Sequence, residues 1–431
     1  MTKNQLGQYI IPIAVLLVAI NSVMFSMFLK TGVAVNNTTI WWIIQAIILG
    51  IFFIWKNKFV HKNQIQLMSV VHYYLIWNVF SIVHGLLVAE GYWDWKGLIN
   101  NSMSLLIPIV AYAATNKLLV QYILKIFVRY GLPVFIGLML FIFPDAYGYY
   151  LAPISFLLLF FPVLNTRWKL FLVALALLVI LADLSARSNV IKFSFPLILS
   201  FIYYFRNYLS THIFESVRKL FFLLPILLFI LAATDTFNIF HMDDYIDTEF
   251  ITLSSKAERG VVEQSLKADT RTFIYLEVLY SAEKYDYWWI GRSPARGYES
   301  YYFGLDDMSN RGERLGSEVS ILNIFTWTGL IGVGLYFCIF YRASYLAIHE
   351  SNNIFMKILG AFIAFRWLYA WIEDFNIFNI TYFFLWVMIG ICFSKSFRAM
   401  SNKEMMTWVN SIFEKPKKKI KQRRIKNKYV R

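Results

Sequence analysis

The chain has 431 residues, of which 58% are hydrophobic, 19% aromatic and only 16% charged. Soluble domains carry roughly 25% charged residues, and a soluble protein of this size could not bury so much apolar surface. The composition therefore excludes a soluble protein and indicates an integral membrane protein. The formal net charge of +15 does not indicate nucleic-acid binding, because residues 415–431 alone hold ten Lys and Arg and no acid.

Apolar runs of about 17 to 25 residues predict membrane-spanning helices. In chain order, these runs are 9–29, 39–55, 67–89, 98–115, 126–143, 148–164, 168–182, 190–205, 220–234, 319–340, 355–371 and 381–397. We expect an all-α polytopic membrane protein with about 12 transmembrane helices, and the shortest runs leave a range of about ten to thirteen.

The basic residues of the short loops predict the orientation, because cytoplasmic loops carry an excess of Lys and Arg. They occur in alternate loops, at Lys56, Lys58, Lys62, Lys117, Lys125, Arg167, Arg206, Arg218 and Lys219. The loops between these carry mostly acids, at Glu90, Asp94, Asp145, Asp183, Glu373 and Asp374. We therefore expect both termini in the cytoplasm, with a basic tail at 398–431 that binds the anionic lipids of the inner leaflet rather than nucleic acid.

One long connection, residues 235–318, separates the predicted helices 1–9 (residues 1–234) from helices 10–12 (residues 319–397). It holds 16 of the 26 acids and nine basic residues, so its net charge is −7. Its aromatic and periodic apolar residues are unlike a disordered tether, so we expect a folded external subdomain. Residues 261–285 have helical spacing, and the Gly- and Pro-rich stretch after them predicts a turn or loop.

Several basic residues lie on the predicted outer side or inside the membrane, against the general bias. They are Arg187, Lys192, Arg271, Arg292 and Arg296, together with Arg366 inside the eleventh predicted span. Guanidinium groups bind phosphate oxygens bidentately, and an intramembrane charge is costly unless it faces protein or a cavity. The cluster predicts a site for a lipid diphosphate, while ion pairs with the loop acids, or of Arg366 with Glu373 or Asp374, are the structural alternative.

At these residues the chain resembles the bacterial O-antigen and capsule polysaccharide polymerases (Wzy-like) and the related O-antigen ligases. The resemblance rests on the topology, on the segment Ser185–Ser188 around Arg187, and on Arg271 followed by the turn Gly291–Gly297. The glycine-containing helix after the loop also looks like the family's post-loop helix. The ligases carry a histidine at the end of this loop, whereas no histidine lies between His241 and His349 here. This difference favours a polymerase.

The resemblance implies glycosyl transfer between polyprenyl-diphosphate-linked oligosaccharides at the outer leaflet of the bacterial cytoplasmic membrane, with a chain-length regulator as a further partner. Arg271 and Arg187 would stabilise the departing diphosphate, with Arg292, Arg296, Lys192 and Arg366 as further binding residues. Glu277 or Glu318 would accept the proton of the attacking hydroxyl. We expect no cofactor and no metal.

Two other functions fit part of the pattern. An O-antigen ligase would use the same lipid-linked donor. A flippase for lipid-linked oligosaccharides would also have about twelve spans, but such folds show two similar halves and short loops, which this sequence lacks.

Overall fold

The computed structural model describes residues 3–33, 37–59, 66–183, 186–234, 236, 253–257, 260–264, 272–301 and 311–414. Arg271 and residues 415–431 of the basic tail lie outside these residues, so the predictions that concern them stay predictions.

The described chain is almost entirely helical. The first half forms α1 (Lys3–Thr31), α2 (Thr38–Phe59), η1 (Gln66–Met68), α4 (Ser69–Val88), α5 (Tyr92–Leu106), η2 (Ile107–Ile109), α6 (Val110–Ala114), α7 (Lys117–Ile126), η3 (Phe127–Gly131), α8 (Leu132–Leu138), η4 (Pro144–Ala146), α9 (Tyr147–Tyr150), α10 (Ala152–Leu158), η5 (Phe161–Val163), α11 (Thr166–Ala182), α12 (Arg187–Ser200), η6 (Phe201–Phe205) and α13 (Thr211–Ala233). The second half forms β1 (Leu253–Ala257), β2 (Gly260–Gln264), α14 (Thr272–Tyr285), β3 (Tyr298–Glu299), β4 (Glu313–Arg314), α15 (Ser320–His349), α16 (Ile354–Tyr369), α17 (Ile380–Phe393), α18 (Lys395–Arg398) and α19 (Asn402–Phe413).

Seven helical segments of the described chain are long and apolar enough to cross a membrane. They are Ile10–Thr31, Thr38–Lys56, Gln66–Val88, Tyr92–Ala114, Lys117–Leu138, Arg187–Phe205 and Ser320–His349. The protein is therefore an all-α membrane protein, as the composition predicts. Each of the twelve predicted spans overlaps at least one helix, but the number that cross the bilayer stays a prediction.

Asparagine side chains cap the N-terminal ends of several of these helices. The Oδ1 atom of Asn353 accepts a hydrogen bond from the N–H of Met356 at the start of α16 (2.9 Å), and Asn379 does the same for Tyr382 at the start of α17 (2.9 Å). Each bond satisfies one of the N–H groups that a first helical turn leaves without a partner. This matters most in an apolar environment, where water cannot supply the missing acceptor.

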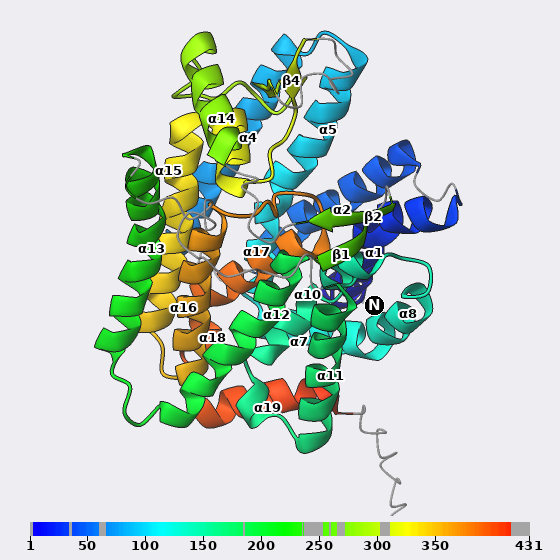
Figure 1. Ribbon diagram of the computed structural model, residues 1–431. Coiled ribbons are helices and arrows are strands. Elements are labelled where there is room, and N and C mark those ends of the chain that lie inside the picture. The colour runs from blue at the N-terminus through cyan, green and yellow to red at the C-terminus, as the bar shows by residue number, and fades with distance from the viewer. Residues whose placement is uncertain are drawn as a thin grey trace, which may run out of the picture.

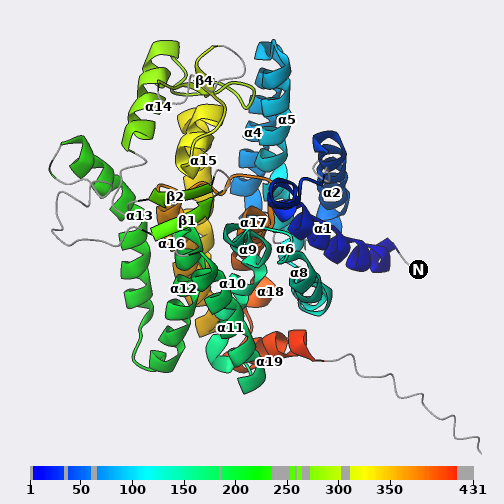
Figure 2. The ribbon, with the colours of Figure 1, turned by 45° about the vertical axis from the view of Figure 1, so that its right-hand side comes forward.

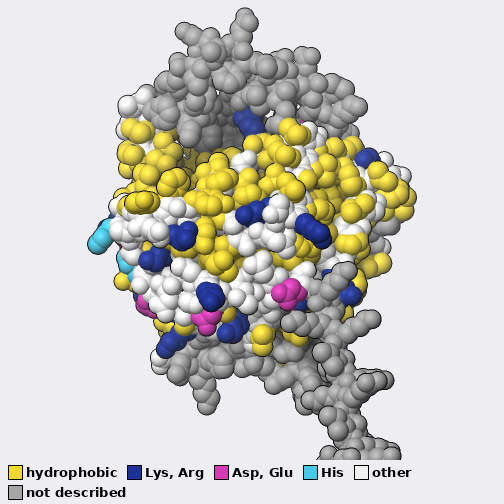
Figure 3. All heavy atoms as spheres, turned by 90° about the horizontal axis from the view of Figure 1, so that it is seen from below, with side chains coloured by type: hydrophobic (Ala, Val, Ile, Leu, Met, Phe, Trp, Pro, Cys, Tyr) yellow, Lys and Arg dark blue, Asp and Glu magenta, His cyan; other side chains and the backbone are white. Residues whose placement is uncertain are grey.

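The helices form a bundle in which α15 packs against α16, α4 and α17, and α13 packs against α16. Figures 1 and 2 show α14 and β4 at one end of the molecule, beside the connection between α4 and α5, and α19 across the opposite end. The end that carries α19 is basic, and in Figure 3 Lys and Arg side chains outnumber acids on this face. Lys117 and Lys403, which line a pocket beside α19, are among the exposed basic residues at this end.

Two predicted boundaries are wrong. Residues 261–264 belong to β2, which pairs with β1 in an antiparallel hairpin, so the helix expected over 261–285 does not include them. The β-branched pair Val261 and Val262 favours an extended backbone there. The described helix of this stretch is α14, Thr272–Tyr285. The span expected at 126–143 is shifted, because the helical segment runs over Lys117–Leu138. Asn116 caps the first turn of this segment, and the cap determines where the helix begins more strongly than the start of the apolar run does.

The helix α15 is kinked at Gly329, whose φ of +66° and ψ of −173° are not helical. A Cβ atom on this residue would lie 2.2 Å from the carbonyl oxygen of Trp289 and 2.5 Å from the N atom of Gly291. Only glycine adopts this backbone conformation without strain and also allows the loop backbone to approach so closely. The kink is therefore the point at which the segment after α14 docks onto the bundle.

We expect Gly329→Ala to destabilise the protein by on the order of 3 kcal/mol, because it combines a positive φ with a backbone clash. Gly334→Ala is the matched control: it lies in the same helix, its Cβ would meet nothing within 4 Å, and alanine favours the helix by roughly 0.5–1 kcal/mol. Thermal unfolding of the two purified variants in detergent measures the difference. Equal melting temperatures would contradict the role assigned to Gly329.

Candidate functional site

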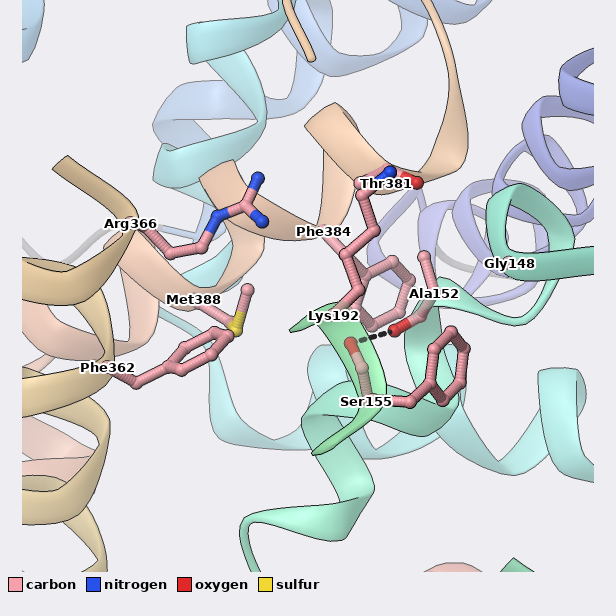
Figure 4. A pocket seen from close by; sticks show the side chains of 10 residues that line it. Gly148, Ala152, Ser155, Lys192, Phe362, Arg366, Thr381, Phe384 and Met388 are labelled. Carbon is pink, nitrogen blue, oxygen red and sulfur yellow. Dashed lines mark hydrogen bonds between the residues drawn. The ribbon is translucent and has the colours of Figure 1, made fainter. Parts of the chain in front are cut away.

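Two of the predicted cationic residues line one small cavity in the bundle. Lys192 projects from α12 and Arg366 from α16, and Figure 4 shows both beside Thr381, Phe384 and Met388 of α17. The two residues are almost fully buried, at 6% and 4% exposure. The cavity volume is about 20 Å³, which is room for about one water molecule. A larger ligand therefore requires neighbouring side chains such as Phe384 to move.

Aromatic rings stabilise both cations. The guanidinium carbon of Arg366 lies 4.2 Å from the ring centroid of Phe375 and 5.2 Å from that of Tyr369. The Nζ atom of Lys192 lies 4.8 Å from the ring centroid of Tyr149 and donates a hydrogen bond to Ser188 Oγ at 3.3 Å. The Nε and Nη2 atoms of Arg366 are buried without a hydrogen-bond partner among the described residues. These free donors could bind an anion.

Two acids follow Arg366 in the chain, at the end of α16. Glu373 interacts electrostatically with both Lys192 and Arg366. Glu373 and Asp374 are both half-buried, and the loss of hydration raises the pKa of the Asp374 carboxyl group to about 6. Two carboxyl groups therefore lie near enough to interact electrostatically with the cations of the cavity, although neither acid lines it. This arrangement suits both anion binding and proton transfer.

The segment that carries these acids is held by Ser320, the first residue of α15, which is fully buried. Ser320 donates its N–H to the carbonyl of Glu373 (3.2 Å), and its Oγ accepts from the N–H of Phe375 (2.9 Å). Asn376 donates from Nδ2 to the carbonyl of Ser320 at 2.8 Å. The start of α15 thus fixes the position of the acids, a role that no sequence motif indicated.

Arg187 is the first residue of α12, one turn before Lys192. Its neighbour Ser188 accepts the hydrogen bond from Lys192, and the carbonyl of Ser188 accepts one from the hydroxyl of Tyr369 at 3.5 Å. The short Ser/Arg segment therefore contacts Lys192, a residue that lines the cavity, through Ser188.

Arg292 and Arg296 form a separate cluster around Glu313. Arg292 Nη2 lies 3.0 Å from Glu313 Oε1, and Arg296 contacts both carboxylate oxygens, at 2.6 Å and 3.0 Å. The hydrogen bond to Glu313 raises the pKa of Arg296. Arg292 also donates to the carbonyl of Gly297 at 2.7 Å. A diphosphate would have to compete with Glu313 for both arginines.

The two predicted proton acceptors also have partners within the long connection. Glu277 accepts hydrogen bonds from Ser300 Oγ (2.8 Å) and from the N–H of Tyr301 (2.7 Å). Glu318 pairs with Arg314 at 3.3 Å. Neither lines the cavity of Lys192 and Arg366. The structure brings Lys192 and Arg366 together but holds Glu277 and Glu318 elsewhere.

Arg311 has a role that the sequence pattern did not indicate. It forms ion pairs with Glu90 (3.2 Å) and with the buried Asp94, at the connection between α4 and α5. Nearby, Asn101 donates to the carbonyl of Pro294 at 3.0 Å. These contacts attach the end of the long connection to the α4–α5 hairpin. A local sequence pattern could not indicate this pairing, because more than two hundred residues separate the partners.

No protein-family model, no curated protein and no solved structure matches the chain. Within the described ranges, no group of three or more His, Cys, Asp or Glu side chains could hold a metal ion. The functional assignment therefore depends on the chemistry of the residues themselves.

We expect Glu313→Gln to destabilise the protein by about 3 kcal/mol, because it leaves two largely buried arginines without their counter-charge. Glu318→Gln is the matched control: its side chain is 46% exposed and pairs with one arginine, so it should cost less than about 1 kcal/mol. Melting temperatures of the purified variants measure both effects. If both variants unfold at the same temperature, Glu313 does not hold this cluster together.

Proposed function

We propose that this protein polymerises polyprenyl-diphosphate-linked oligosaccharide repeat units into a surface polysaccharide, either O-antigen or capsule. The observation that carries the proposal is the buried pair Lys192 and Arg366, with donors of Arg366 unpartnered among the described residues, inside a membrane protein. A buried cation is costly without a counter-charge, so such a pair suits a strongly anionic ligand. A lipid diphosphate is an anion that approaches a site from within the bilayer.

The proposal includes a topology. We place about twelve spans in the bacterial cytoplasmic membrane, residues 235–318 on the outer side and both termini in the cytoplasm. Two features support it: α14 and β4 lie at the end of the molecule opposite α19 (Figure 2), and the face that carries α19 is basic (Figure 3). Beyond α19 the basic tail binds the anionic inner leaflet.

The reaction is a glycosyl transfer that needs no metal. A hydroxyl of the incoming repeat unit attacks the anomeric carbon of the growing chain, and the bond from that carbon to the diphosphate breaks. Negative charge builds on the departing diphosphate, so fixed positive groups lower the barrier electrostatically. We assign this role to Arg271, Arg187, Lys192 and Arg366. Arg292 and Arg296, which follow Arg271 in the long connection, are further binding residues.

The start of α14 supports the inclusion of Arg271. The hydroxyl group of Tyr275, in the first turn of α14, donates a hydrogen bond to the carbonyl oxygen of Trp371. Trp371 lies just beyond the end of α16, the helix that carries Arg366. Arg271 lies outside the described residues, and it immediately precedes in sequence this helix that contacts the end of α16. For the acceptor proton, Glu277 and Glu318 stay the proposed bases, and each would have to exchange its present partner.

A flippase for the same lipid-linked units is the second candidate, because paired buried cations and acids also occur in transporters. An O-antigen ligase is the third. The deletion phenotype separates them: a polymerase mutant keeps single repeat units on its surface acceptor and loses long chains. A ligase mutant makes long chains that stay on the lipid carrier, and a flippase mutant has no repeat units outside.

We expect Lys192→Met and Arg366→Lys each to reduce polymerisation roughly a hundredfold, because each removes a preorganised donor from a water-poor site. Arg366→Lys keeps the charge but loses the planar fork. Arg206→Ala, at an exposed arginine on the basic face, is the control and should have no effect. The readouts are the length of the surface polysaccharide on gels and the amount of each variant in the membrane. Full-length polysaccharide at normal abundance in either variant would contradict the proposal.

For Arg271 we expect Lys to be nearly as damaging as Ala, since lysine cannot bind a diphosphate bidentately. The loss should again be about a hundredfold in rate. Single repeat units on the lipid carrier should accumulate in both variants. If Arg271→Ala reaches the membrane at normal levels and still makes long chains, Arg271 belongs to the ion pairs of the long connection.

A further inference from the structure

A second basic pocket lies at the end of the bundle opposite α14. Its lining comes from three parts of the chain: the residues before α4, the connection between α15 and α16, and the segment around α18. The lining residues are Gln66, Leu67, Glu350, Asn352, Lys395, Arg398 and Ala399. Its volume is about 470 Å³, which lies within the range of small-molecule sites.

Polar contacts between these segments shape the pocket. The N–H of Asn352 donates to the carbonyl of Arg398 at 2.8 Å. Asn353 donates from Nδ2 to the carbonyls of Phe397 (3.2 Å) and Met400 (2.9 Å), and the N–H of Ile354 donates to Asn402 Oδ1 at 2.8 Å. Four hydrogen bonds therefore fix the connection between α15 and α16 against the segment around α18, and these two segments form most of the lining.

The charges in the pocket leave one positive charge uncompensated. Arg398 is only 3% exposed, and its Nη1 atom lies 2.5 Å from Glu350 Oε2. Its Nε atom is buried without a hydrogen-bond partner among the described residues. Lys395, at the start of α18, is exposed. Since Glu350 balances Arg398, Lys395 gives the described lining a net charge of +1.

The position of the pocket indicates its ligand. It lies where the apolar segments Gln66–Val88 and Ser320–His349 end, and so at the depth of the lipid headgroups. A phosphodiester carries one negative charge, which would neutralise the pocket, and it presents oxygen acceptors to lysine and arginine. Inorganic phosphate carries more charge at neutral pH and reaches the pocket from water.

We propose that this pocket binds the phosphodiester headgroup of an anionic phospholipid, with Lys395 and Arg398 as the phosphate ligands. The pocket shares no lining residue with the cavity of Lys192 and Arg366, and the proposal does not depend on the proposed polymerase activity. Bound there, a lipid would link the ends of α15 and α17 to the bilayer surface.

The test uses the purified full-length protein, depleted of lipid in detergent. Short-chain phosphatidylglycerol, short-chain phosphatidylcholine and inorganic phosphate are titrated separately at constant ionic strength, and the melting temperature is followed. We expect phosphatidylglycerol to raise the melting temperature most, since ligands that bind the folded state stabilise it. Lys395→Ala should weaken its apparent affinity about fivefold, and Lys395→Arg should restore it.

Lys219→Ala is the control, because Lys219 is 63% exposed on the same face but does not line the pocket. It should bind phosphatidylglycerol like the unaltered protein, and the tail contributes equally in every variant. Equal stabilisation by phosphatidylcholine would show that the lipid tails alone bind. Equal stabilisation by inorganic phosphate would show a site for free phosphate. Either result, or an unchanged affinity of Lys395→Ala, overturns the proposal.

Discussion

Burying charge in an apolar bundle is the constraint on which this structure depends. Moving an ion out of water costs several kcal/mol unless a counter-charge or hydrogen bonds compensate it. The protein meets this cost in different ways at different places. Arg218, which is 1% exposed, forms two hydrogen bonds with Glu215, at 2.6 Å and 2.7 Å. Arg366 has aromatic rings around it and leaves two donors without a partner among the described residues.

This difference separates buried cations that pair with an acid from buried cations that keep unpartnered donors among the described residues. Glu313 uses both of its oxygens on Arg292 and Arg296, so that cluster is complete and stabilises the connection itself. The cavity that Lys192 and Arg366 line is different, because two buried donors of Arg366 have no hydrogen-bond partner among the described residues. An incomplete buried site is costly to the folded state, and proteins retain such sites where a ligand supplies the missing partner.

The long connection contributes to the site indirectly. Its described part is attached to the bundle at three places: at Gly329 through the backbone of Trp289 and Gly291, at Asp94 through Arg311, and at the end of α16 through Tyr275. Ser320, the first residue of α15 after the connection, holds the segment with Glu373 and Asp374. A change in the connection that moves the start of α15 would therefore also move these two acids.

The membrane class, the helical character and most helix positions followed from the sequence alone, because apolar runs of bilayer length are a local property of the chain. The sequence also indicated Lys192 and Arg366, since a charge inside an apolar run stands out in one dimension. It did not predict that Lys192 and Arg366 share a cavity, that Glu313 occupies Arg292 and Arg296, or that Ser320 positions the acids. Nor did it predict the strand at 261–264. These features depend on partners from distant segments, as when Arg311 meets Asp94. Only the packing of the helices, which sets the distances between side chains, decided which charges were paired and which kept donors without a partner among the described residues.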